Sequence, residues 1–75
     1  MRSLSTIAAE ISRLWTKPYF GAVPYLAAMR TLNSVSDNYG YDSGRSIVNY
    51  FLANAAGFRG PDARRIKAEL KALVK

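Results

Sequence analysis

The sequence contains no cysteine and no histidine. Disulfide bonds are therefore excluded, and so are zinc sites built from thiolate or imidazole ligands. The same absence removes thiol nucleophiles and histidine-based catalytic triads. We therefore expect no cofactor, no metal and no enzymatic activity.

Acidic residues are also scarce, because the chain has only five of them. No two lie three or four residues apart, so a pair of carboxylates on one face of a helix is not expected. Asp37 and Asp42 bracket a turn but lack the alternating oxygen ligands of a calcium loop. We predict that these two residues form turns and helix caps.

Long apolar runs are missing as well. No stretch approaches the 18 or more apolar residues that span a bilayer, and the N-terminal segment is too polar for a signal peptide. A first helix lying on a membrane surface is the alternative, but its polar face carries little basic charge. The sequence thus predicts a cytoplasmic protein without a membrane partner.

The chain of 75 residues is long enough for one domain, residues 1–75, with a small core. Association of two copies would bury further apolar surface, so we expect a homodimer. Eleven Lys and Arg against five Asp and Glu give a net charge of +6, which favours an anionic partner.

Apolar residues at three- and four-residue spacing predict four helices. We expect them at residues 5–15, 23–32, 43–56 and from 61 onward, with a long loop at residues 33–41. Ser3 or Ser5 would cap the first helix, and Asp42 or Ser43 the third. No run alternates long enough for a strand. The predicted fold class is all-α, a compact single-domain bundle of about four short helices.

Residues 49–68 match the spacing of a helix-turn-helix unit, in which a glycine turn joins two helices. Gly57 would adopt the left-handed conformation just past the third helix. In this arrangement Arg59, Arg64 and Arg65 would reach base edges in the major groove of duplex DNA. Three lysines would contact phosphates instead. They are Lys67, Lys71 and Lys75.

Two other interpretations of this region remain. Its cations could form a solvated helix face, with Arg65 paired to Glu69 four residues later. Residues 57–60 also form a GxxG loop, as in KH domains, but the three-stranded sheet of those domains is not predicted. DNA binding is the interpretation that accounts for the concentration of positive charge after Gly57.

Aromatic residues suggest a competing function. They make up 12% of the chain, more than a core of this size readily encloses. Exposed tyrosines beside arginines are typical of protein interfaces. Tyr39 and Tyr41, in the long loop, are the candidate contacts to a host protein or to a second copy. Folding back onto the third helix is the alternative for both.

Residues 19–26 (YFGAVPYL), 39–43 (YGYDS) and 59–71 (RGPDARRIKAELK) together resemble a family of small actinobacteriophage proteins. The resemblance covers the chain from about Lys17 onward. It implies a phage origin and expression in the host bacterial cytoplasm, and it assigns no functional residues.

Overall fold

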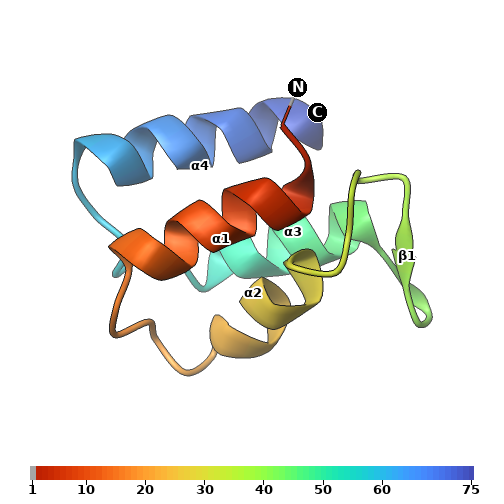
Figure 1. Cartoon of the computed structure of the whole chain (residues 1–75), viewed down its shortest axis with the longest axis horizontal. Helices are drawn as coiled ribbons and strands as arrows, with labels where there is room; N and C mark the ends of the chain where they lie inside the picture. The colour runs from red at the N-terminus through yellow and green to blue at the C-terminus, as the bar shows by residue number, and fades with distance from the viewer. Residues whose placement is uncertain (1) are drawn as a thin grey trace.

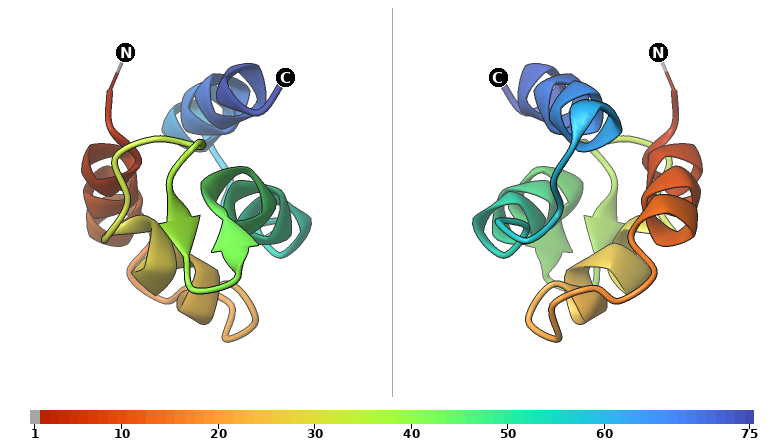
Figure 2. Two further views of the ribbon diagram at one scale, coloured as in Figure 1. Left: turned by 90° about the vertical axis from the view of Figure 1, so that its right-hand side faces the viewer. Right: turned by 90° about the vertical axis from the view of Figure 1, so that its left-hand side faces the viewer.

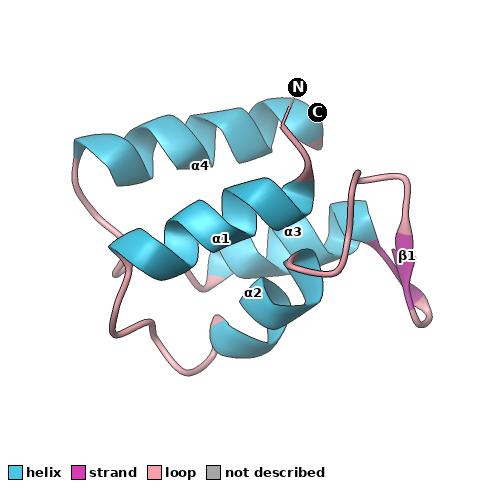
Figure 3. Cartoon of the chain, in the orientation of Figure 1, coloured by secondary structure: helices cyan, strands magenta, loops and turns pink. Residues whose placement is uncertain are grey.

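The computed structural model describes residues 2–75. Four helices surround one apolar core, as the end-on views of Figure 2 show. They are α1 (Leu4–Leu14), α2 (Val23–Met29), α3 (Gly44–Ala53) and α4 (Pro61–Leu73). Between α2 and α3 lies a small antiparallel hairpin of β1 (Asn38–Tyr39) and β2 (Asp42–Ser43), drawn in magenta in Figure 3.

The hairpin corrects the prediction of a purely all-α fold. Asn38 pairs with Ser43 and Tyr39 with Asp42, across a turn in which Gly40 has a φ of 61°. Glycine adopts this left-handed conformation without the steric cost that a Cβ would bring. Strands of two residues are too short to produce an alternating pattern, which is why no strand was predicted. The fold is mostly helical.

The helices begin within one residue of their predicted starts but end earlier. Ser3 and Ser43 cap α1 and α3, each accepting a backbone N–H bond three residues ahead, at 3.1 Å in both cases. Gly60 and Pro61 are the cap and first residue of α4. The second helix stops at Met29 rather than at Leu32, and the third at Ala53 rather than at Ala56.

The core is formed by the inner faces of all four helices. Ile7 and Ile11 of α1, Phe51 of α3 and Ile66 of α4 are fully buried. Trp15, after α1, stacks on Phe58 at 5.3 Å between ring centroids and meets the edge of Phe51 at 6.3 Å. These rings join the end of α1 to the connector before α4.

The chain between α2 and α3 is fixed by local hydrogen bonds. The Asp37 carboxylate accepts the backbone N–H groups of Asn33 and Ser34 at 3.0 and 3.1 Å, the structural role predicted for it. The carbonyls of Leu32 and Asn33 accept the N–H groups of Ser5 and Leu4, the first turn of α1. This loop therefore supplies acceptors for N–H groups in the first turn of α1, which have no partner within the helix.

Candidate nucleic-acid interface

Helix α4 carries most of the predicted site, and it lies at one side of the molecule, antiparallel to α1 (Figure 1). Ala63, Ile66 and Leu70 form its buried face. The polar residues on either side of this face have very different surroundings. One edge of α4 faces α1 and carries acids, whereas the other edge carries cations.

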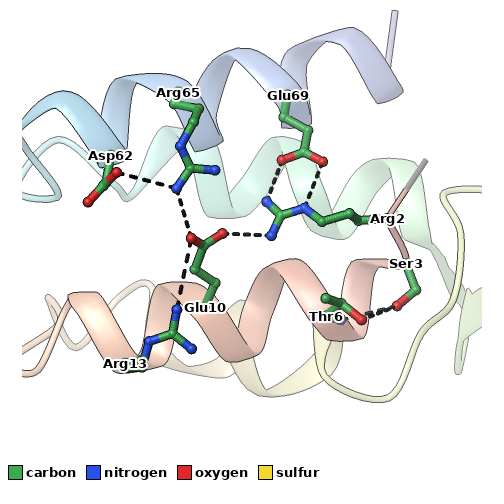
Figure 4. Close-up of polar contacts among 8 residues, drawn as sticks. All are labelled: Arg2, Ser3, Thr6, Glu10, Arg13, Asp62, Arg65 and Glu69. Carbon is green, nitrogen blue, oxygen red and sulfur yellow. Dashed lines mark hydrogen bonds and ion pairs between the residues drawn. The ribbon is translucent and has the colours of Figure 1, made fainter.

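On the α1 side, three arginines and three acids form one ion-pair network (Figure 4). Arg2 holds both oxygens of Glu69, at 2.5 and 3.1 Å, and also donates to Glu10 at 2.7 Å. Arg65 donates to the other Glu10 oxygen at 2.7 Å. Glu10 therefore receives a guanidinium from each side, which ties α1 to α4.

These contacts set the protonation of the two glutamates. Hydrogen bonds from Arg65 and then Arg2 lower the pKa of Glu10 to about 2. The hydrogen bond from Arg2 lowers the pKa of Glu69 in the same way. Both carboxylates stay ionised well below neutral pH. In return, the bond to Glu10 raises the pKa of Arg65.

The network corrects one prediction, the pairing of Arg65 with Glu69. Arg65 pairs with Glu10 and, at 3.4 Å, with Asp62, whereas Glu69 is bound by Arg2. The sequence could not reveal this because Arg2 and Glu69 are 67 residues apart. Of the predicted DNA contacts, Arg65 thus lies on the α1 side, separated from the others and engaged by acids.

The net positive charge of the protein lies outside this ion-pair network. It takes three of the eleven basic residues and three of the five acidic ones, so it is neutral. The whole net charge of +6 therefore lies outside it, on eight cations and two acids. Those two acids are Asp37 and Asp42, in the loop and the hairpin before α3.

The other five predicted cations lie on the opposite side of α4 or in the residues that flank it, and we call them the cationic face. Within residues 2–75, none of the five forms an ion pair. Four of them are exposed and Lys67 is half-buried. The face consists of Arg59, Arg64, Lys67, Lys71 and Lys75.

Lys67 shows that these charges are close together. Its ammonium lies 5.9 Å from the centroid of the Phe58 ring, within reach of a cation–π contact. Burial lowers the pKa of Lys67, and repulsion from Lys71 and Arg59 lowers it further. A like-charge effect of this kind indicates a local positive field that no neighbouring acid cancels.

The connection before α4 differs from the predicted helix-turn-helix turn. Residues 54–60 separate the two helices, more than the three or four residues typical of the motif. Asn54 caps α3, and Gly57 is not left-handed, because positive φ occurs only at Gly40 and Gly60 among the described glycines. In Figure 1, α3 and α4 run in opposite directions across the molecule.

The predicted protein contacts lie at a different site. Tyr39 is half-exposed and Tyr41, at the tip of the hairpin, is fully exposed, so Tyr41 does not fold back onto α3. Sequence reasoning missed Phe20, which is 80% exposed beside Tyr19 in the connector between α1 and α2. Phe20 lies among apolar residues in the sequence, and only the fold reveals its exposure.

Comparisons with known proteins identify no relative: no family model, no curated protein and no solved structure matches the chain. Over residues 2–75, no helix has the length and apolar character needed to cross a membrane. Nor does that part of the chain contain a group of three or more acidic residues placed to hold a metal ion.

Proposed function

We propose that this protein is a non-enzymatic DNA-binding protein that contacts its ligand through the cationic face of α4. The main support for this proposal is the separation of charge between the two sides of α4. Its acids are paired with arginines on the α1 side, and its remaining cations face outward without acidic partners. A nucleic acid supplies a dense row of phosphates that such a face attracts.

The cationic face does not require a helix-turn-helix to contact DNA. The long connector and the antiparallel course of α3 and α4 differ from that motif, whereas the cationic face is independent of the turn. Arg65 is left out of the proposed contacts because Glu10 and Asp62 hold its guanidinium. The phage origin implied by the resemblance is compatible with this function and remains a proposal too.

The test is a salt titration of duplex DNA binding, followed by fluorescence anisotropy. Each phosphate contact contributes about −0.9 to the slope of log K against log salt, so about four exposed cations predict a slope near −3.6. The double variant R64A/K71A should weaken binding and reduce the slope by about 1.8. Both side chains are exposed, so the fold should be retained.

The matched control is K17A/R30A, which also removes one lysine and one arginine, but from the α1–α2 connector and the end of α2. It should change the slope much less than R64A/K71A does. Absence of binding at low salt, or equal losses in the two double variants, would contradict the proposal.

A second candidate function, a protein-interaction module, is favoured by the exposed rings. Phe20 and Tyr41 lie in different loops, and both are largely solvent-exposed. Light scattering tests whether the chain is a homodimer, and a host-lysate pulldown tests for a bacterial partner. If F20S and Y41S bind no less than the unmodified chain, these rings are not the contact surface.

A further inference from the structure

Apart from its arginines and lysines, which can bind guanine as well as phosphate, the cationic face has no side chain that hydrogen-bonds to base edges. Residues 61–73 include no Asn, Gln, Ser or Thr, so α4 lacks the amides and hydroxyls that commonly bond base edges. Between its cations lie Ala68 and Ala72, both exposed. These methyl groups can contact a surface but cannot donate or accept a hydrogen bond.

Three other groups of α4 that could read bases are engaged elsewhere. Asp62 and Glu69 could accept a hydrogen bond from cytosine, but Arg2 binds both oxygens of Glu69, and one oxygen of Asp62 accepts from Arg65 at 3.4 Å. Arg65 could bind guanine through both of its terminal nitrogens, but Glu10 occupies it at 2.7 Å. The ion-pair network therefore fixes the fold and at the same time removes three side chains with sequence-reading chemistry.

The spacing of the free cations suits a regular phosphate backbone. Lys67, Lys71 and Lys75 are each four residues apart and so lie about 6 Å apart along the helix axis. Arg64 extends the row, which then covers about 16 Å, the axial span of about five phosphates on one strand of a duplex. Lysine acts as a mobile point charge and tolerates small mismatches in position.

The face also lacks the feature that single-strand binders use, an exposed aromatic ring on which bases stack. Phe58, beside Lys67, is only 4% exposed. Tyr50 lies against Tyr25 of α2, with ring centroids 5.3 Å apart. Four other exposed rings belong to the α1–α2 connector and the hairpin, away from α4 (Figure 1). They are Tyr19, Phe20, Tyr39 and Tyr41.

From these observations we infer that the cationic face binds the phosphate backbone of duplex DNA independently of base sequence. This inference rests on the proposed function and specifies its ligand class. It replaces the expected division of labour, in which arginines read bases and lysines hold phosphates, with a single role for all five cations. The network arginines contribute by holding α4 in place.

The experiment compares two kinds of probe at about 50 mM salt and without competitor DNA: a panel of duplexes of equal length and unrelated sequence, and the matching single strands. Dissociation constants across the duplex panel should agree within about threefold. Single strands should bind about tenfold more weakly, because counterion release is smaller for them, about 0.7 rather than 0.9 per phosphate over about four contacts.

Two variants sharpen the comparison. R64A should weaken binding to every duplex by the same factor, whereas R65A should leave affinity within about twofold, with circular dichroism used to verify that it folds. A duplex preferred by tenfold or more, or an R65A variant that weakens binding to one sequence selectively, would overturn sequence independence. Single strands that bind as tightly as duplexes would overturn the choice of duplex.

These outcomes separate the inference from the proposed function. If no probe binds at low salt, the proposed function itself fails. If a probe binds with a strong sequence or strand preference, and R64A/K71A still weakens it, the proposed function stands and only this inference is wrong.

Discussion

Replacing Gly44 with alanine should destabilise the protein, although alanine is the better helix former. Gly44 is the buried first residue of α3. A Cβ placed there would lie 2.7 Å from the Ser34 carbonyl oxygen and 3.0 Å from the Val35 Cα. Both are backbone atoms, so a side-chain rotation cannot relieve the contact.

The loop that causes this contact is also held in place. The Gly44 N–H donates to the Asp37 carbonyl at 2.6 Å, and the Arg45 N–H donates to that of Val35 at 3.0 Å. Overpacking costs about 1–3 kcal/mol, and a weakened hydrogen bond costs about 1 kcal/mol more. Alanine recovers about 0.5–1 kcal/mol of helix propensity. We expect a net loss of about 2 kcal/mol.

Thermal unfolding followed by circular dichroism measures this loss. For a domain of this size, about 2 kcal/mol corresponds to a fall in Tm of about 8–16 °C. The control is G57A, because a Cβ there would meet only Trp15 at 3.7 Å and the backbone is not left-handed. G57A should keep or slightly raise the Tm. A G44A protein as stable as the unmodified chain would refute the argument.

Three further predictions follow from the caps, the core and the network. S43A should lose about 1 kcal/mol, measured by urea unfolding, because Ser43 caps α3 through its bond to Ser46; equal midpoints would contradict this. F51A should lose about 3–5 kcal/mol in the same assay because Phe51 is fully buried, and a loss below about 1 kcal/mol would count against the described core. The pKa of Glu10 in the folded state is about 2, below its ordinary value of about 4.5. The ionised Glu10 therefore contributes fully to stability above about pH 4.5, and this contribution is lost as the pH falls towards about 2. The Tm of the unmodified chain should therefore fall more steeply over this pH interval than that of E10Q, which cannot titrate there. Parallel curves of Tm against pH would contradict the lowered pKa of Glu10.

Local signals predicted the helices well because their causes are local. Ser3, Ser43 and the Gly60–Pro61 pair are caps whose chemistry acts within one turn. The ends of α2 and α3 were placed too late, because apolar residues continue past Met29 and Ala53 in turns that still face the core. Burial alone does not say whether the backbone is helical.

The candidate site was predictable in part, for the same reason. The helical spacing of Arg64, Lys67, Lys71 and Lys75 places them on one face wherever α4 packs. The ion-pair partner of Arg65 depends on which helix lies beside α4, which is a property of the tertiary structure. Glu10, the residue that holds it, precedes it by 55 positions, and no periodicity within α4 could indicate the pairing.

The network between α1 and α4 also has a consequence for how the chain folds. Arg2 and Glu69 are 67 residues apart, and Glu10 and Arg65 are 55 residues apart. Their bonds close long loops, so they form only when α1 and α4 are both present and the chain between them has already compacted. We therefore expect a variant truncated before α4 to remain unfolded, because α1 then loses both its packing partner and the acceptor of Arg2.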